Sequence, residues 1–267
     1  MRLIRCETAD GRICFGEELE SNRVQPMKGC MYGDYEPDGG AVAVKRLLAP
    51  VKPSNIICIG LNYLEHAEES GNEVPDIPVV FMKPTTAVTD PFAQIRIPKS
   101  ADSRGEVDYE VEIAVVIGKR ALNVSESHAL DYVLGYTVAN DVSARKIQLE
   151  SPGTQWDRGK GFDTFCPLGP AIVTTDEIKN PQSLLLKTIL NGTVMQDYSA
   201  DRMIFSVAAL ISYLSTDTTL LPGTVILTGT PPGVGFARTP PVFLMPGDTI
   251  RVEVSSIGAL INTVEKV

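Results

Sequence analysis

One stretch of the 267-residue sequence decides the fold class: Val107-Asp108-Tyr109-Glu110-Val111-Glu112-Ile113-Ala114-Val115-Val116-Ile117. Its second half is an apolar run rich in β-branched residues, which is typical of a buried strand. Side chains alternate along a strand, so Glu110 and Glu112 share one face while apolar neighbours occupy the other. The stretch therefore predicts a long strand, over residues 107–118, that carries two acidic side chains into an apolar core.

Two carboxylates on one face of a buried strand suggest a metal site. They repel each other, and each costs several kcal/mol to desolvate unless something neutralises it. A divalent cation does so, and an all-oxygen ligand set favours Mg²⁺, with Mn²⁺ or Ca²⁺ as alternatives. Asp141 follows an apolar strand at 136–140 and offers a third carboxylate. The alternative is a solvated strand face on which Glu110 and Glu112 pair with Lys or Arg.

Strand signals dominate the rest of the chain. Turn pairs at Asp10-Gly11 and Asn191-Gly192 predict two hairpins. Expected strands lie at 2–6, 12–15, 55–60, 79–82, 133–140, 184–190, 193–196, 224–228 and 249–254, helices at 62–70 and 204–214, and a loop at 33–40. We expect a mixed, β-rich (α+β) fold with few helices. We divide it into a small N-terminal β-rich domain, 1–53, and a catalytic domain, 54–267.

Composition excludes several classes of function. The sequence is 43% hydrophobic and 21% charged, which supports a sizeable core and argues against global disorder. Its net charge of −9, with no Lys/Arg-rich run, makes nucleic acid and anionic membranes poor partners. No apolar run reaches the roughly 18 residues that cross a bilayer. The first seven residues turn polar too early for a secretory signal.

The cysteines point to a reducing compartment. Their number is odd, their spacing is irregular, and no C-x-x-C pair occurs, which favours free thiols over a disulfide framework. The same pattern removes the usual thiolate zinc sites. We therefore expect a cytoplasmic protein. The five cysteines are Cys6, Cys14, Cys30, Cys58 and Cys166.

The chain has two histidines, and His66 is the candidate for acid–base work. On the predicted helix, His66 and Glu69 are i,i+3 neighbours. A carboxylate beside a histidine fixes its tautomer and raises its basicity, as in a general base with its orienting partner. The alternative is an exposed helix with routine contacts. His128 looks like an ordinary residue early in a helix, and we assign it no role.

Basic and glycine-rich segments supply candidate substrate contacts. Lys160 stands between two glycines, where a backbone can approach a ligand closely and the amine can stabilise a carboxylate or enolate; a surface turn is the alternative. Arg145 and Gln148 would be neighbours on a helix and could hold a substrate carboxylate. The loop at 228–235 offers hydroxyls and backbone N–H groups as a possible anion cradle, or is simply a tight turn. It matches neither a Walker A loop nor a dinucleotide fingerprint.

Several motifs, in their order and spacing, resemble the fumarylacetoacetate hydrolase family. The resemblance covers residues from about 54 to the C-terminus and implies a β-roll of mixed sheets that forms a homodimer. It is carried by Ile59-Gly60-Leu61-Asn62-Tyr63 through His66, Phe81-Met82-Lys83-Pro84, Asp108-Tyr109-Glu110-Val111-Glu112, Asn140-Asp141-Val142-Ser143-Ala144-Arg145, Lys160-Gly161-Phe162-Asp163, Leu227-Thr228-Gly229-Thr230-Pro231, Pro246-Gly247-Asp248 and Ile257-Gly258.

The resemblance also implies roles for single residues. Glu110, Glu112 and Asp141 match the metal-binding carboxylates. His66 and Glu69 match the catalytic histidine and its acidic partner, and Lys160 matches the lysine that stabilises an oxyanion or enolate. The substrate-contacting positions are matched by Arg145, Gln148 and Thr230.

The implied activity is metal-dependent hydrolysis of a C–C bond in an acylpyruvate-type 2-oxo acid. Mg²⁺ would chelate the oxo acid while the His66–Glu69 pair activates water. Decarboxylation of oxaloacetate or a related β-oxo dioate, and isomerisation of a 2-hydroxy-diene dioate, use the same residues and stay open. A catalytically silent protein that binds metal and oxo acid is the non-enzymatic alternative. We expect residues 68–78 to act as a mobile lid that contributes selectivity.

Overall fold

A large mixed sheet forms the body of the protein. The computed structural model describes residues 1–102 and 106–267. Within these residues the largest sheet has twelve strands, with the main order β2-β3-β5-β1-β14-β12-β11-β17-β6-β7, while β4 and β8 pair with β3 and β14. Their bounds are β1 Arg2–Thr8, β2 Ile13–Leu19, β3 Arg23–Gly29, β4 Tyr35–Pro37, β5 Val42–Leu48, β6 Ile56–Gly60, β7 Val79–Lys83, β8 Val88–Thr89, β11 Val111–Ile117, β12 Val133–Asn140, β14 Cys166–Thr174 and β17 Val225–Leu227.

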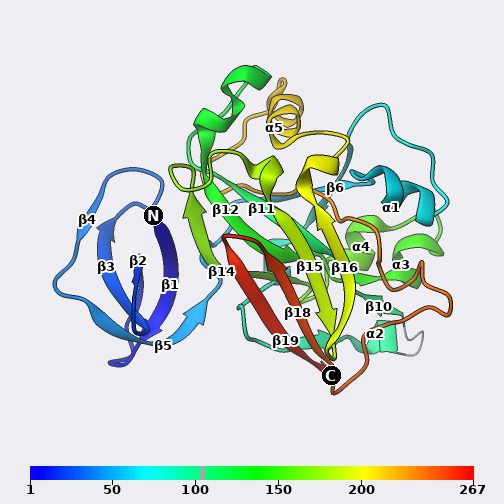
Figure 1. Ribbon diagram of the computed structural model, residues 1–267, viewed down its shortest axis with the longest axis horizontal. Helices are drawn as coiled ribbons and strands as arrows, with labels where there is room; N and C mark the ends of the chain where they lie inside the picture. Colours follow the sequence, from blue (N-terminus) through cyan, green and yellow to red (C-terminus); the bar gives the residue numbers. More distant parts are fainter. Residues whose placement is uncertain (103–105) are drawn as a thin grey trace.

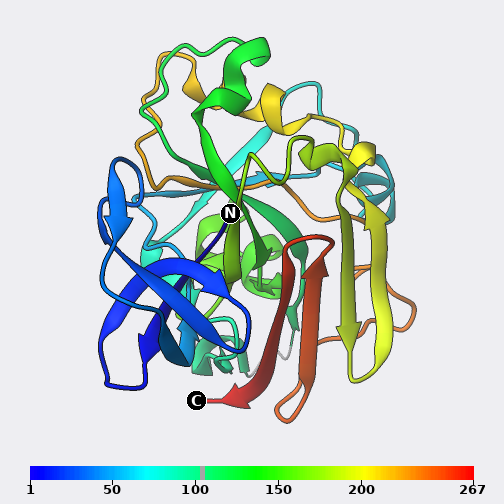
Figure 2. The same cartoon turned by 60° about the vertical axis from the view of Figure 1, so that its left-hand side comes forward.

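A second sheet packs against the centre of the first. Its order is β16-β15-β18-β19-β9, and β18 and β19 lie beside β15 and β16 in Figure 2. The strands are β9 Ile95–Ile97, β15 Leu185–Leu190, β16 Thr193–Ser199, β18 Thr249–Val254 and β19 Gly258–Lys266. Buried side chains from both sheets form one apolar core that includes Ile113, Tyr136, Val252 and Leu260. This core fixes the positions of β11 and β12, which carry the acidic residues.

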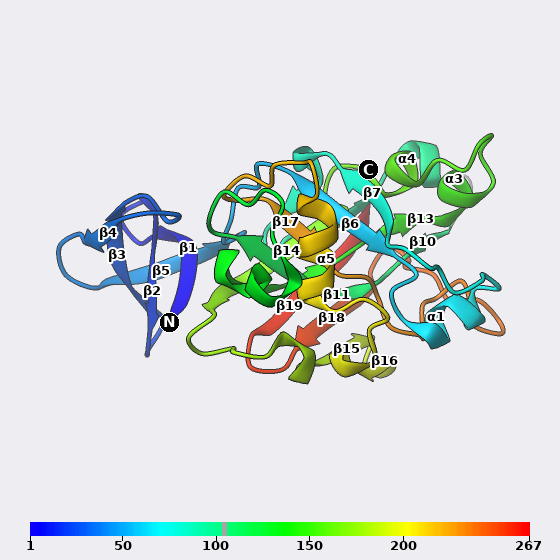
Figure 3. The ribbon, with the colours of Figure 1, turned by 90° about the horizontal axis from the view of Figure 1, so that it is seen from above.

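Helices are few and short, so the expected mixed, β-rich fold is confirmed. They are α1 Leu64–Glu69, α2 Lys99–Asp102, α3 Arg145–Leu149, α4 Trp156–Lys160 and α5 Val207–Ser215, with 3-10 turns at Thr85–Ala87, Glu126–Tyr132, Pro181–Ser183 and Ala200–Arg202. Figure 3 shows α1, α3 and α4 at one end of the molecule, opposite β1–β5. In the described residues, no helix is long and apolar enough to cross a membrane.

The N-terminal strands form a lobe that is continuous with the main sheet (Figure 1). The predicted first hairpin is present as β1 and β2, and β1 also pairs with β14 through Arg2↔Val173 and Leu3↔Ile172. The expectation of loop throughout 33–40 was wrong, because Tyr35–Pro37 adds to the edge of β3. The domain boundary after residue 53 stays a prediction.

The predicted strand over 107–118 is interrupted. Val107–Asp108 forms a short strand, β10, that pairs with β13, Ser143–Ala144, and β11 starts only at Val111. Between them, backbone donors turn to side chains: the Glu110 N–H donates to Asn140 Oδ1, and the Val111 N–H donates to Gln196 Oε1. Because the strand is broken here, the side chains of Asp108 and Glu110 face the end of the molecule where α3 and α4 lie.

Candidate active site

Three carboxylates meet where β11 and β12 lie side by side. Glu110 and Glu112 flank the start of β11, and Asp141 follows the end of β12. The pairing Val111↔Asn140 brings them together. One oxygen atom from each residue lies within 4.8 Å of the others, and all three side chains are buried. This burial excludes the solvated strand face of the alternative interpretation, although the pairing with Lys and Arg that it also expected is present for Glu110.

Buried cations surround two of these carboxylates. Lys160 Nζ donates to Glu110 Oε2 and Asp141 Oδ2, both at 2.8 Å, and Arg145 Nη1 lies 2.7 Å from Glu110 Oε1. Lys83 Nζ donates to the other oxygen of Asp141. Burial alone would raise the pKa of Glu110, but Lys160 and Arg145 outweigh it and lower that pKa to about 2. Glu110 is thus ionised and held from both sides.

Glu112 differs from its two neighbours. Among the described residues no Lys or Arg forms an ion pair with it, and the Gly229 N–H, at 2.7 Å, is the donor that reaches it. Burial, followed by the charges of Asp141 and Glu110, raises the pKa of Glu112 well above its ordinary value. A divalent cation at the triad would remove this penalty, and three carboxylates are the donors that hard cations prefer. The residues present therefore fit a metal ion.

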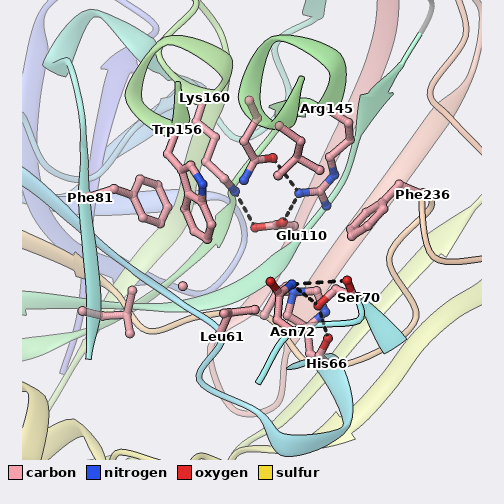
Figure 4. Close-up of a pocket in the computed structure, with 15 residues that line it drawn as sticks. Leu61, His66, Ser70, Asn72, Phe81, Glu110, Arg145, Trp156, Lys160 and Phe236 are labelled. Atoms are coloured by element: carbon pink, nitrogen blue, oxygen red, sulfur yellow. Dashed lines mark hydrogen bonds and ion pairs between the residues drawn. The ribbon is translucent and has the colours of Figure 1, made fainter. Parts of the chain in front are cut away.

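A histidine–glutamate pair faces the triad from α1. His66 Nδ1 lies 2.8 Å from Glu69 Oε1, so the predicted i,i+3 contact is present. The Gly233 N–H donates to both oxygens of Glu69, at 3.1 and 2.9 Å, and this fixes the carboxylate. A hydrogen bond from Nδ1–H to Glu69 leaves Nε2 as the acceptor. Figure 4 shows His66 across the cavity from Glu110.

The glycine-rich loop after β17 does bind anions, but they are the protein's own carboxylates. Gly229 donates to Glu112 and Gly233 donates to Glu69. Gly235 and Phe236 donate to the two oxygens of Asp108, at 2.8 and 3.0 Å. One loop thus orients a residue of the triad, the partner of His66 and the partner of Arg145. The expected cradle for an external anion is not what these N–H groups form.

A cavity with a volume of about 170 Å³ lies between Glu110 on one side and His66 on the other. It is lined by polar side chains that include His66, Glu110, Arg145, Gln148, Lys160 and Thr230, and by apolar ones that include Leu61, Phe81, Leu149, Trp156 and Phe236. An apolar cavity of roughly 150 Å³ holds one benzene molecule, so this one suits a compound of a few carbon atoms. All the predicted substrate-contacting residues line it.

Arg145 keeps one guanidinium nitrogen free for a ligand. As predicted, Arg145 and Gln148 are neighbours on α3, with Nη1 donating to Gln148 Oε1 at 3.1 Å. Nε donates to Asp108 at 2.8 Å, and the guanidinium lies over the Phe236 ring, 4.4 Å from its centroid. Nη2 is buried and has no partner among the described residues. A buried guanidinium N–H without an acceptor is costly, and a substrate carboxylate would satisfy it.

The glycines beside Lys160 have a different function from the one expected. A Cβ at Gly159 would lie 2.7 Å from the backbone of Gln148, and one at Gly161 would lie 2.5 Å from the Asp157 carbonyl oxygen. The close approach they permit is to the chain itself: Gly159 lets α4 pack on α3, and Gly161 lies against the carbonyl of Asp157 in α4 and against Pro84. Packing of these two helices places Lys160 between Glu110 and Asp141, with one of its three N–H donors left over.

Sequence reasoning missed several residues of the site. Lys83 is buried beside Asp141, and a period of two along Val79–Lys83 puts it on the same inward face as Phe81, which was a usable signal. Asp108 was quoted in a motif but given no role, although it anchors Arg145. Trp156 and Phe236 line the cavity from loops and short helices, where no periodicity marks them.

Comparison with known proteins agrees with the geometry. A β-rich fold with a His–Glu pair opposite a buried acidic triad defines the class as fumarylacetoacetate hydrolase-type enzymes. The family model described as fumarylacetoacetate (FAA) hydrolase C-terminal matches residues 55–265, and the chain belongs to this family.

Relatives and solved structures refine this assignment. The mitochondrial oxaloacetate tautomerase fahd2 of Xenopus laevis is 49% identical over 219 residues, which are 82% of this chain and 68% of the relative. A 5-carboxymethyl-2-hydroxymuconate delta-isomerase from Mycobacterium smegmatis has a TM-score of 0.86 at 38% identity, with both chains fully covered. A 2-hydroxyhepta-2,4-diene-1,7-dioate isomerase from Mycobacterium marinum has a TM-score of 0.83 at 39% identity, covering 100% of this chain and 98% of that one. These proteins are named for tautomerisation or isomerisation.

Proposed function

We propose that this enzyme is a Mg²⁺-dependent tautomerase that interconverts the keto and enol forms of a small 2-oxo acid, with oxaloacetate as the first substrate to test. The observation that carries the proposal is the position of His66, which is held by Glu69 and lines the cavity across from Glu110 and Lys160. Tautomerisation needs one base to move a proton between carbon and oxygen, and needs no attacking water. The tautomerase and isomerase names of the relatives support this choice.

Glu110, Glu112 and Asp141 would hold the metal ion. When bound, the cation polarises the 2-oxo group and stabilises the negative charge that develops on its oxygen. The ligand set is all oxygen, which suits Mg²⁺ best and leaves Mn²⁺ and Ca²⁺ as alternatives.

The chain's own residues bind the substrate and move the proton. The free Nη2 of Arg145, with Gln148 and the Thr230 hydroxyl, binds a carboxylate of the substrate. His66, oriented by Glu69, takes a proton from the carbon next to the oxo group and delivers it to the enolate oxygen, and ketonisation runs through the same transfers in reverse. Lys160 donates its remaining N–H to the oxygen that gains charge.

Hydrolysis of an acylpyruvate C–C bond is the second candidate. It was the leading expectation from the sequence, and the His66–Glu69 pair is also an arrangement that activates water. Decarboxylation of oxaloacetate would use the same residues without any base. We rank both below tautomerisation because the relatives quoted above are named for tautomerisation or isomerisation.

The test follows the enol absorbance of oxaloacetate with Mg²⁺, after EDTA, and after Mg²⁺ is restored. We expect ketonisation faster than in buffer, lost with EDTA and recovered with the metal, and absent in a His66→Asn variant. Release of pyruvate and CO₂ would identify a decarboxylase, and pyruvate plus acetate from acetylpyruvate would identify a hydrolase. Metal-loaded protein that accelerates none of these reactions would contradict the proposal in favour of a silent binding protein.

We also propose a homodimer, as the family resemblance implies. The edge strand β7 of the large sheet exposes Val80 and Met82 at 43% and 44%, which an edge-to-edge or face contact would cover. Light scattering coupled to size-exclusion chromatography tests this, and a monomer at micromolar concentration would contradict it. A cytoplasmic location stays a prediction, and several relatives carry the word mitochondrial in their names.

A further inference from the structure

Two cysteines face each other across the first hairpin, far from the cavity. Cys6 on β1 and Cys14 on β2 are direct partners in the antiparallel register, and their sulfur atoms lie 3.8 Å apart. Opposed Cα atoms in antiparallel strands are about 4.5–5.5 Å apart, which is within the range that a disulfide bridges. The register therefore places the two cysteines at a separation compatible with a disulfide.

The two thiols differ in access. Cys6 is fully buried, whereas Cys14 is partly exposed and lines a cavity of about 550 Å³ on the N-terminal lobe. An external reagent thus reaches Cys14 first, and Cys6 is placed to react with whatever forms there. Burial, together with the adjacent Cys14 sulfur, raises the pKa of Cys6 to about 12, so Cys6 does not begin the reaction.

The cavity beside Cys14 carries positive charge. Arg5, Arg12, Lys28 and Lys52 line it, with Asp38 as the acidic side chain among the lining residues. Arg12 and Lys28 form ion pairs with Asp10 and Glu36, but Arg5 and Lys52 form no ion pair among the described residues. In a chain of net charge −9 this is a local exception. It favours the approach of an anionic reagent.

We propose that Cys6 and Cys14 form a thiol–disulfide exchange site for an anionic low-molecular-weight disulfide of the glutathione class. The Cys14 thiolate attacks the disulfide, forms a mixed disulfide and releases one glutathione thiolate. Cys6 then attacks the Cys14 sulfur, and its proton passes to the departing glutathione thiolate, which leaves as the second glutathione. The two protein thiols give up two electrons in all, and one glutathione disulfide becomes two glutathione molecules.

The other cysteines allow a clean test. Cys30 is exposed and would itself form a mixed disulfide, while Cys58 and Cys166 are buried near the acidic triad. The experiment therefore uses full-length Cys30→Ser protein, incubated with glutathione disulfide, alkylated under native and then denaturing conditions, and mapped by mass spectrometry. We expect the peptides that contain Cys6 and Cys14 to be joined, with two hydrogen atoms lost and no glutathione retained.

Two further variants separate the steps. Cys6→Ser should stop at the mixed disulfide on Cys14, whereas Cys14→Ser should leave Cys6 as a free thiol. A Cys30→Ser protein that keeps glutathione on Cys14 with Cys6 still alkylatable, or that leaves both thiols unreacted, would overturn the proposal. That result needs neither of the other variants to fold, and it is independent of catalysis in the cavity.

Discussion

The two walls of the active-site cavity are built in opposite ways. The carboxylate wall stands on β11 and β12, in the centre of the large sheet, and its charged residues are nearly inaccessible. The histidine wall stands on α1, a helix of six residues followed by a largely exposed segment at 71–77. An isolated helix of that length has little stability of its own. We infer that the carboxylate wall is the rigid half of the site and holds the charged groups. The histidine wall is the adaptable half and moves protons.

The contacts of each wall support this division. Glu110, Asp141, Lys83, Lys160 and Arg145 form one continuous buried network of ion pairs. On the opposite wall, α1 buries His66 and Ala67, the Glu69 carboxylate accepts from Gly233, and Glu65 interacts with Arg202 and Tyr198. Segments with few buried contacts open most readily. Residues 68–78, which we expected to form a lid, adjoin this wall.

Glu110→Ala should have the largest effect, because it breaks the rigid wall. Lys160 and Arg145 would both lose a carboxylate partner inside the protein, which costs about 3–5 kcal/mol of unfolding free energy. One candidate metal ligand is also lost. We expect the metal content of purified protein to fall, as measured by elemental analysis, and Mg²⁺-dependent turnover to disappear. Denaturant unfolding measures the loss of stability.

The control is Glu253→Ala, which removes a surface partner of Arg251 on β18. A surface ion pair contributes at most about 1 kcal/mol, so metal content and turnover should stay at the wild-type level. Wild-type metal content in Glu110→Ala would remove Glu110 from the ligand set.

His66→Asn should affect the adaptable wall alone. Asparagine has no basic nitrogen, and general-base catalysis is worth roughly 10²–10⁴-fold in rate. We expect kcat to fall by about that factor, with metal content and the midpoint of unfolding unchanged. Glu69→Gln is the matched variant: it keeps an acceptor for the Gly233 N–H but loses the charge beside His66, so its loss should be smaller. If the midpoint of unfolding of His66→Asn fell together with kcat, the two walls would not be independent.

Lys83→Met comes third in size and tests a residue that sequence reasoning missed. The substitution keeps the length of the side chain but removes the cation at one oxygen of Asp141, while Lys160 still holds the other. A buried acceptor left without a donor costs about 1–3 kcal/mol, and more when the group is charged. We expect a loss of that size in the apo protein, and a smaller loss once saturating Mg²⁺ compensates the carboxylate. A loss that Mg²⁺ leaves unchanged would show that Lys83 acts through packing.

In both walls, the contacts within one element were predictable from the sequence. Period-two alternation placed Glu110 and Glu112 together, and this prediction holds although Glu110 lies just before β11 and not within a regular strand. The pairing of His66 with Glu69 followed in the same way from helix geometry. The direction of Lys83 was available from the same rule. The contacts between these elements join residues that are far apart in the sequence. The Gly233 N–H donates to Glu69, 164 residues earlier in the chain, and no local sequence pattern predicts that contact.

Local rules also misjudged some strands. Strand β14, in the middle of the large sheet, reads Cys-Pro-Leu-Gly-Pro-Ala at its start, and prolines and glycine argue against a central strand. The break after Asp108 was equally hidden, since its cause is the side chains of Asn140 and Gln196. Tertiary partners supply or replace the ladder bonds at both places, and these partners are distant in sequence.

Tyr198→Phe should have the smallest effect and tests how α1 is attached. The substitution keeps the ring that packs edge-on against Tyr63, with centroids 5.9 Å apart, but removes the hydroxyl. A hydrogen bond from that hydroxyl, followed by the one from Arg202, lowers the pKa of Glu65 on α1 to about 2. The variant should therefore show a higher Glu65 pKa by carboxyl NMR titration.

The pH dependence gives the sign of the effect. A lowered carboxyl pKa stabilises the folded state above the unfolded value of about 4.3, and this contribution is lost as the pH falls through the folded pKa of about 2. The free energy of unfolding of the wild type should exceed that of Tyr198→Phe by less than about 1 kcal/mol at pH 7. This difference should vanish near pH 2. A difference that persists there would mean that the hydroxyl stabilises α1 through a neutral contact, and the attachment of the histidine wall would then not depend on charge.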